Sequence, residues 1–428
     1  MRVAIIGSGL AAVAVAKVMI KRGIRPVILD VGEDLDSERK KVVSRLSKQE
    51  PTQWSEVDRK FITSNATVNN KSIPRKLAFG SGYFYGENSS DFSLIKSGNA
   101  PPFSFAKGGF SIGWGASVLP ADDCDTNDWP IGRKELENYY EDVLRDLPYS
   151  AENDALSANF PLYRSDCQPL DLTDGNQSLL NDIESSKIFC KDKVLFGRSR
   201  LLVKAPDANG KNGCKYCGCC MSGCVYNYIY KSSVDINIML ESGSIDYIKG
   251  VYVDRLQEAN NQVTVYTTNK AGTSETRAFD RVFLAAGAVN STKIVLTSKD
   301  IFNEKVLLKS TVGFVAPMFR FKRSSLGAFS VNTQPGLFFD FKVPGLSNHW
   351  VHSQVSTPNE LVLAKLKVDI KKTGLVNSIK KWLVSHLVVA NCNLHSNHSN
   401  GYELHIEKGV DGGVNLISNR ELGPEARK

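Results

Sequence analysis

Short apolar segments separated by glycine-rich turns dominate the first thirty or so residues. Residues 3–6 (VAII) are apolar throughout, which is typical of a parallel strand buried on both faces. Residues 13–20 have the spacing of a helix, and residues 27–30 (VILD) form the next buried strand. The pattern therefore predicts a β-α-β unit of about thirty residues.

The later chain shows two further patterns. Residues 280–287 (DRVFLAAG) predict a buried strand that ends in glycine, followed by a helix from about residue 291. Apolar and polar positions then alternate in three stretches, residues 315–322, 336–343 and 402–407. These predict an antiparallel sheet, and residues 374–390 predict an amphipathic helix packed on the core. We expect an α/β fold with a Rossmann-like domain and a second α+β domain built on the antiparallel sheet.

The turn after the first strand has the glycine spacing of a dinucleotide-binding loop. Gly7 permits the tight turn, Gly9 lets the backbone approach a pyrophosphate, and Ala12 permits close packing of helix on strand. The pyrophosphate would lie at the helix N-terminus, where free N–H groups and the helix dipole favour an anion. Asp30 ends the second strand and would accept hydrogen bonds from ribose hydroxyls. The motif does not distinguish FAD from NAD.

A second glycine-dense segment, KGGFSIGWGAS, spans residues 107–117. A flexible linker would be polar, whereas Phe110, Ile112 and Trp114 require burial. Glycines among apolar residues indicate backbone pressed against a flat partner. We therefore expect this segment to line a binding site.

These pieces, in this order, resemble the glucose–methanol–choline (GMC) family of flavin oxidoreductases. Residues 108–116 are similar to the family's GGxSxxxWGA loop beside the flavin, and residues 128–140 (DWPIGRKELENYY) are close to its DWPI and LExYY text. Residues 285–295 (AAGAVNSTKIV) match its second FAD-side strand, and Val253 falls where relatives contact the adenine. The resemblance covers most of residues 1–300 and continues weakly to about residue 420.

The resemblance implies an FAD-dependent enzyme that oxidises a CH–OH group of a small-molecule alcohol by hydride transfer to the flavin. It implies an FAD-binding domain of residues 1–45, 96–150 and 191–300, and a substrate domain of residues 46–95, 151–190 and 301–428. The cofactor-binding residues that it implies are Gly7, Gly9, Ala12, Asp30, Gly108, Gly109, Ser111, Trp114, Gly115, Ala116, Val253, Ala286 and Gly287. The electron acceptor stays unknown.

Five of the nine cysteines lie between residues 214 and 224. Cys214, Cys217, Cys220 and Cys224 have the C-x2-C-x2-C-x3-C spacing with which bacterial ferredoxins bind an iron–sulfur cluster, and Cys219 is additional. Zinc is disfavoured, because two CxxC knuckles normally have a longer loop between them. The run is also similar to the CxxCGxCxxGC stretch of a GMC subgroup associated with polysaccharide gene clusters.

Two departures from the ferredoxin pattern leave the role of the cysteines open. Val225 replaces the usual proline, and a single cluster requires either a rearranged Cys224 or a remote thiol. The remote candidates are Cys124, Cys167, Cys190 and Cys392. An iron–sulfur cluster and metal-free packed thiols both remain, and either would be accessory to the flavin.

Composition and charge limit the function classes. No apolar run reaches the length of a membrane span, and the first residues lack a convincing signal-cleavage site, so we expect a cytoplasmic location. Of the net charge of +8, most lies in residues 301–428, which hold 16 Lys and Arg against 9 Asp and Glu. We expect no nucleic-acid binding, because no such motif accompanies the charge. The basic region would attract an anionic or sugar-like alcohol, although a solvated face is the simpler explanation.

No catalytic residue can be assigned from the sequence. Relatives have a catalytic His, with a His or Asn partner, near the C-terminus, and no such motif precedes Lys428. The six histidines, each expected to be structural, are His349, His352, His386, His395, His398 and His405. We expect the chain to be truncated or to obtain this module differently. The alternative function is a flavin-binding, catalytically incomplete protein or an electron-transfer component with an iron–sulfur cluster.

Overall fold

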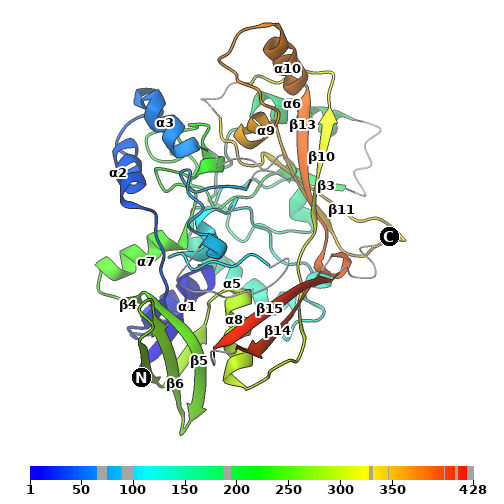
Figure 1. Ribbon diagram of the computed structural model, residues 1–428. Helices are drawn as coiled ribbons and strands as arrows, with labels where there is room; N and C mark the ends of the chain where they lie inside the picture. Colours follow the sequence, from blue (N-terminus) through cyan, green and yellow to red (C-terminus); the bar gives the residue numbers. More distant parts are fainter. Residues whose placement is uncertain are drawn as a thin grey trace.

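The structure is a computed structural model in which one parallel and three antiparallel sheets are connected by helices (Figure 1). It describes residues 1–64, 75–88, 101–186, 194–326, 331–345, 347–399, 401–409 and 413–421. The combination of a parallel sheet with antiparallel sheets confirms the α/β fold class expected from the sequence.

The parallel sheet contains the predicted β-α-β unit, which consists of β1 (Val3–Ile6), α1 (Leu10–Lys21) and β2 (Val27–Asp30). β4 (Asp246–Lys249) and β8 (Arg281–Leu284) flank this unit in the strand order β4-β2-β1-β8. Because every pair is parallel, the carboxyl ends of β1, β2 and β8 lie at one edge of the sheet. The helix after β8 is α8 (Ala288–Ser298), which begins slightly before the predicted residue 291.

The parallel sheet is covered on both faces, which explains its continuous apolar strands. Ile5 and Ile28 belong to a core cluster with residues of α1 and α7 (Ser232–Glu241). Ala4, Ile6 and Leu29, at alternate positions, belong to a cluster with the opposite layer. That layer is an antiparallel sheet of β5 (Val251–Ala259), β6 (Gln262–Asn269) and β7 (Ser274–Phe279). The period of two along each strand thus divides the side chains between two cores.

A five-stranded antiparallel sheet forms the second large part of the fold. Its order is β10 (Gly313–Phe319), β13 (Leu387–Asn393), β12 (Val351–Ser356), β11 (Leu337–Phe341) and β3 (Val194–Arg198). Helix α6 (Asp174–Ser185) contributes Leu180 and Ile183 to the core cluster of this sheet. The antiparallel sheet predicted after residue 300 is therefore present, and it recruits β3 from the part of the chain assigned to the FAD-binding domain.

A third antiparallel sheet is formed by β15 (Val414–Glu421), β14 (Gly401–Lys408) and β9 (Val306–Leu308). The sequence predicted one sheet after residue 300, but β14 belongs to this separate sheet. Leu404, Ile406 and Leu416 are fully buried in a cluster that includes Tyr252 of β5 and Leu296 of α8. These C-terminal strands therefore pack against α8 and β5, beside the parallel sheet (Figure 1). The division into two domains remains a prediction.

The prediction of a core-packed helix over residues 374–390 was wrong in two respects. Helix α10 (Leu375–Ser385) ends earlier, and residues 387–393 form β13, which pairs with β10 and β12. The β-branched Val388 and Val389 favour the strand, and two partner strands satisfy its backbone groups. Val384 of α10 is buried, but the other five apolar residues of the helix are exposed, namely Leu375, Val376, Ile379, Trp382 and Leu383.

The remaining helices connect these layers. They are α2 (Ser37–Leu46), α3 (Glu56–Thr63), α4 (Asp123–Thr126), α5 (Arg133–Arg145) and α9 (Glu360–Lys365). Among the residues that the structure describes, no helix is both long enough and apolar enough to cross a bilayer.

The packing of the C-terminal strands on α8 and β5 yields a first prediction. Leu404→Ala removes a fully buried side chain and should lower the free energy of unfolding by about 2–5 kcal/mol. Leu307→Ala, on the neighbouring strand β9, is the matched control, because Leu307 is 64% exposed. Denaturant unfolding of both variants measures the difference. Equal, small effects would show that β14 does not contribute to the stability of this core.

Candidate dinucleotide site

A cavity of about 630 Å³ lies at the carboxyl ends of β1, β2 and β8. This volume falls within the range typical of ligand pockets. Nine of the thirteen cofactor-binding residues expected from the sequence line it: Gly7, Gly9, Asp30, Gly108, Gly109, Ser111, Val253, Ala286 and Gly287. Residues from five places in the sequence therefore meet around one space, at the edge of a parallel sheet where open α/β folds bind ligands.

Gly7 brings β1 close to the end of β8. Its φ is +95°, in the left-handed region that favours glycine. A Cβ atom at this position would lie 2.5 Å from the carbonyl oxygen of Ala285 and 3.0 Å from Cα of Ala286. Glycine is thus required both by the backbone conformation and by the contact with the loop that follows β8.

Two helix N-termini face the cavity. Gly9 is the N-cap of α1 and Gly287 is the N-cap of α8, and neither helix has a side-chain cap or an acidic residue in its first turn. Their first backbone N–H groups therefore keep a partial positive charge that is not offset locally. In the described part of the chain, no atom beyond the adjoining residues would lie within 4 Å of a Cβ at Gly9 or at Gly287. The arrangement provides room and backbone donors for an anionic group.

A buried network of serine hydroxyls joins the first glycine loop to residues 108–111. The Ser8 hydroxyl accepts a hydrogen bond from the backbone N–H of Gly108, with a distance of 2.9 Å between Oγ and N. The Ser232 hydroxyl, at the start of α7, is 3.1 Å from the carbonyl oxygen of Ser8 and 3.0 Å from that of Gly108. Ser111 Oγ donates to the Gly108 carbonyl at 2.6 Å and accepts from the Ser232 N–H at 3.1 Å. All three serines are buried.

Asp30 is held at the end of β2 by two hydroxyl donors. Ser8 Oγ donates to Oδ2, and the Tyr247 hydroxyl donates to the same oxygen at 2.7 Å. Burial raises the pKa of Asp30 to about 6, although these hydrogen bonds and the backbone N–H of Gly32 act in the opposite direction. A carboxylate has four lone-pair positions, so Asp30 can accept further hydrogen bonds from a ligand.

The other four expected residues do not line the cavity. Ala12 is a fully buried residue of α1 and packs in the core between this helix and the sheet. Trp114, Gly115 and Ala116 follow the turn at Gly113 and leave the cavity. The indole N–H of Trp114 donates to the carbonyl oxygen of Tyr230 at 2.8 Å, and Ala116 is fully buried in a different core. Residues 108–116 therefore connect the cavity wall to a second region of the protein.

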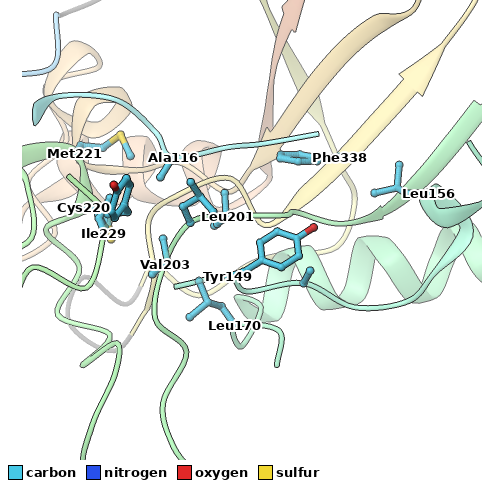
Figure 2. Packing of buried hydrophobic residues seen from close by; sticks show 13 residues of the cluster. Ala116, Tyr149, Leu156, Leu170, Leu201, Val203, Cys220, Met221, Ile229 and Phe338 are labelled. Atoms are coloured by element: carbon cyan, nitrogen blue, oxygen red, sulfur yellow. The ribbon is translucent and has the colours of Figure 1, made fainter. Parts of the chain in front are cut away.

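That second region contains the cysteine-rich loop. Figure 2 shows Cys220 and Met221 in one core with Ala116 and Ile229. Cys214 and Cys224 pack against the same core, whereas Cys219 is buried in a neighbouring core against which Cys217 packs. Asn332 Nδ2 lies 3.5 Å from Cys214 Sγ, and its Oδ1 lies 3.7 Å from Cys220 Sγ.

The thiols of the loop act on one another electrostatically. Burial is the main cause that raises the pKa of Cys214, to about 11, and the pKa of Cys220 and Cys224. A hydrogen bond with Cys219, followed by burial, raises the pKa of Cys217. In each of the four, a neighbouring cysteine contributes to the increase. Within the described residues all eight cysteines are free, and Cys190 lies outside them.

Two lysines lie beside the loop. Lys76 Nζ donates to the carbonyl oxygen of Trp114 at 2.8 Å. Burial lowers the pKa of Lys76 and of Lys231, and the charge of Cys224 opposes this decrease at both. Both ammonium groups would offset negative charge in the loop.

None of the six histidines lines the cavity. His352 Nδ1 lies 2.9 Å from the Asp340 carboxylate, His386 Nδ1 lies 2.8 Å from the Arg320 carbonyl oxygen, and His405 Nε2 lies 3.0 Å from Glu407. His349, His395 and His398 are grouped together on another part of the surface. The structure therefore does not assign a general base in the cavity.

Sequence reasoning missed the polar residues that connect the segments. Ser8 stands between two motif glycines, and Ser232 begins a helix, but nothing in their spacing marks them as partners. Asn290 was also missed, although its side-chain amide donates to the carbonyl oxygens of Ala286 (3.0 Å) and Ser104 (3.2 Å). The signal available for Asn290 was its place directly after the second glycine turn.

Comparisons with known proteins give a likeness in fold alone. No family model matches the sequence, and no curated protein sequence matches it. Among solved structures, pyridoxine 4-oxidase from Mesorbium loti is similar with a TM-score of 0.51 and 12% identity, over 98% of this chain and 75% of that chain. At this identity the likeness supports the fold and does not transfer an activity.

Two further solved structures align less closely. CabE, an aromatic hydroxylase from angucycline biosynthesis, has a TM-score of 0.29 and 9% identity, over 92% of this chain and 43% of that chain. The p-nitrophenol 4-monooxygenase PnpA from Pseudomonas putida DLL-E4 has a TM-score of 0.29 and 10% identity, over 92% of this chain and 57% of that chain. At these TM-scores, neither likeness supports a conclusion about the fold or the function of this chain.

The close approach of Gly7 to the β8 loop yields a second prediction. Gly7→Ala should lower the free energy of unfolding by at least about 1–3 kcal/mol, because the positive φ is strained for alanine and its Cβ would meet the Ala285 carbonyl. Gly9→Ala, two residues away with a φ of −72°, should cost at most about 1 kcal/mol. Thermal or denaturant unfolding of the two variants tests this. A Gly7→Ala variant as stable as Gly9→Ala would contradict the proximity of the two loops.

Proposed function

We propose that the chain is an FAD-dependent oxidoreductase of the GMC type that acts on the CH–OH group of a small alcohol. The observation that carries the proposal is the convergence of the β1–α1 glycine loop, Asp30, residues 108–111 and the β8–α8 glycine turn around one cavity. This convergence supports a dinucleotide with a pyrophosphate, and the order of the motifs resembles that of the GMC family. An anionic or sugar-like alcohol remains our proposal for the substrate.

The residues of the cavity fit FAD in three respects. Uncapped N–H groups at Gly9 and Gly287 would bind the pyrophosphate, and the Asp30 carboxylate would accept hydrogen bonds from a ribose. Apolar side chains such as Val253 and Ile294 provide surface for flat rings. A Cβ at Gly109 would lie 3.7 Å from Cα of Gly9, so the two glycine loops approach closely around the site.

The chemistry divides between the cofactor and the protein. When bound, FAD supplies a hydride acceptor at flavin N5. This chain's residues bind and orient the dinucleotide, and the apolar wall excludes water from it. We assign no catalytic base, because no histidine lines the cavity.

The role of Asp30 gives a third prediction. Asp30→Asn should weaken FAD binding by about 1–3 kcal/mol, which corresponds to roughly 5- to 150-fold in Kd, because it removes a charged hydrogen-bond acceptor. Asp246→Asn is the control, since Asp246 is exposed, pairs with Arg25 and lies outside the cavity. Flavin fluorescence titration measures both Kd values.

The pKa of Asp30 adds a test by pH. Because this pKa is about 6, the carboxylate of the free protein becomes protonated as the pH falls through 6, and its capacity to accept from ribose decreases. FAD affinity of the unsubstituted protein should therefore decrease below pH 6, whereas that of Asp30→Asn should not follow this titration. Tight NAD binding without affinity for flavin would contradict the proposal.

We further propose that the cysteine-rich loop holds an iron–sulfur cluster as an accessory to the flavin. Cys214, Cys217, Cys220 and Cys224 are all free. Cys214, Cys220 and Cys224 share one core, and Cys217, which packs against the neighbouring core, contributes to the raised pKa of the other three, which supports thiols gathered in one region. The sulfur donor set suits iron, and Lys76 and Lys231 would offset the negative charge of a thiolate-bound cluster. Residues 114–116 connect the cavity wall to the core that contains Cys220, and this connection supports a cluster that is accessory to the flavin.

The two adjacent cysteines of the loop give a fourth prediction. Cys220 packs with Cys214 and Cys224, whereas Cys219 lies in another core, where its sulfur is 3.2 Å from the Arg59 guanidinium. Anaerobically prepared protein should contain iron and sulfide in equal amounts, Cys220→Ser should lose both, and Cys219→Ser should retain them. Iron and sulfide analysis provides the measurement. Absence of iron, with all five thiols titrating as free, would leave packing as the role of the loop.

A further inference from the structure

A second group of potential metal ligands lies outside both sites. Cys124 and Asp125 belong to α4, His349 precedes β12, and His395 follows β13. One ligand atom each from Cys124, Asp125 and His349 lie within 4.8 Å of one another. Among the residues that the structure describes, no other group of three or more His, Cys, Asp or Glu residues has ligand atoms this close together. Two segments that are distant in the sequence therefore bring a sulfur, an oxygen and a nitrogen together.

Asp125 presents one oxygen to this group. Its Oδ2 accepts a hydrogen bond from the backbone N–H of Asp122 at 3.0 Å, as part of the capping box of α4. Its Oδ1 lies 3.8 Å from Cys124 Sγ and 3.5 Å from His395 Nε2. The cap fixes the carboxylate, so Oδ1 stays directed toward the thiol and the histidines.

His349 offers a nitrogen without a partner. Its Nε2 lies 3.4 Å from Asn397 Nδ2, whereas its Nδ1 is buried and has no hydrogen-bond partner among the residues that the structure describes, although a buried polar atom normally has one. The backbone N–H of His349 donates to Ser347 Oγ at 3.0 Å, and the ring stacks on His395 at 3.7 Å between centroids. These contacts hold the ring in place while Nδ1 remains available to a ligand.

His395 fits a supporting role in the same group. Its Nδ1 accepts the backbone N–H of Asn397 at 3.2 Å, which places the proton of the neutral ring on Nε2. That N–H faces Asp125 Oδ1. A histidine N–H directed at a ligating carboxylate is a typical outer contact of metal sites, where it orients the ligand.

The nearby charges leave the group free for a cation. Asp122 is already engaged by Arg133, Lys342 and the indole N–H of Trp350. Cys124 Sγ also lies 3.4 Å from Asp122 Oδ2, and a metal ion would take the thiol away from this contact. The ammonium group of Lys309 pairs with Asp128. A Cys124 thiolate and the Asp125 carboxylate would together supply two negative charges, which balance a divalent ion.

We propose that Cys124, Asp125 and His349 bind a divalent transition-metal ion, with zinc as the best match, and that a water occupies the fourth position. Sulfur, imidazole nitrogen and carboxylate oxygen are the three donor types that zinc takes in proteins. Tetrahedral bonds of the usual length place ligand atoms about 3.5 Å apart. Side-chain rotations that move the ligand atoms by roughly an ångström would therefore bring them to bonding distance of one ion. The ion would clip α4 to the segments that flank β12 and β13.

Protection of Cys124 from alkylation tests this site separately from the cysteine-rich loop. The full-length protein is treated with iodoacetamide with and without zinc chloride, and each cysteine is quantified by peptide mass spectrometry. Zinc should slow modification of Cys124 at least about tenfold. This factor is the lower end of the change in metal affinity that follows when the contacts around a metal site are altered. Cys167, a partly buried thiol that lies 3.4 Å from the Arg164 carbonyl oxygen, is the internal control and should not respond.

Two variants distinguish ligation from an indirect effect. His349→Ala and Asp125→Asn should each abolish the protection of Cys124, and Asp125→Asn retains an oxygen for the cap of α4. His405→Ala is the matched control, because His405 interacts with Glu407 on β14 and should leave protection intact. Circular dichroism confirms that each variant is folded. Unchanged modification of Cys124 in zinc, or protection that persists in folded His349→Ala and Asp125→Asn, would overturn the proposal.

Discussion

The buried hydrogen bonds between Ser8, Gly108 and Ser232 hold the candidate dinucleotide site together. Ser8 belongs to the first glycine loop, Gly108 to the middle of the chain and Ser232 to the start of α7. Buried polar groups that lose a partner cost about 1–3 kcal/mol each, so a shift of any one segment would leave several groups unsatisfied. The same Ser8 hydroxyl reaches Asp30, and this places the carboxylate at the cavity edge.

Around this network the backbone conformation determines the shape of the cavity. Gly7 allows the loop after β1 to contact the loop after β8, and both strands end at the same edge because they are parallel neighbours. Two helices then begin at Gly9 and Gly287 with their N-termini directed at one space. A pair of uncapped helix N-termini and the carboxylate of Asp30 around one cavity suit a ligand that combines a pyrophosphate with a ribose.

The sequence predicted local features well and long-range packing poorly. The β-α-β unit, Gly7, Gly9, Asp30 and Gly287 were predictable, because glycine turns and terminal acids have short-range signals. Ser232 was not, because its partner Ser8 lies 224 residues away and serine has no characteristic spacing. The helix predicted over residues 374–390 wrongly includes the first four residues of β13, because an apolar run alone does not separate helix from buried strand. Their pairing with two strands decided the outcome.

Residues 108–116 connect the cavity to the cysteine-rich loop. Their first residues line the cavity, and their last residues pack in the core that contains Cys220.

Binding of FAD at the glycine loops is the central claim, and a crystal structure of the protein grown with FAD tests it most directly. We expect the pyrophosphate within hydrogen-bond distance of the N–H groups that follow Gly9, with a ribose on Asp30. FAD bound elsewhere, or a cavity that accepts NAD and excludes FAD, would contradict it.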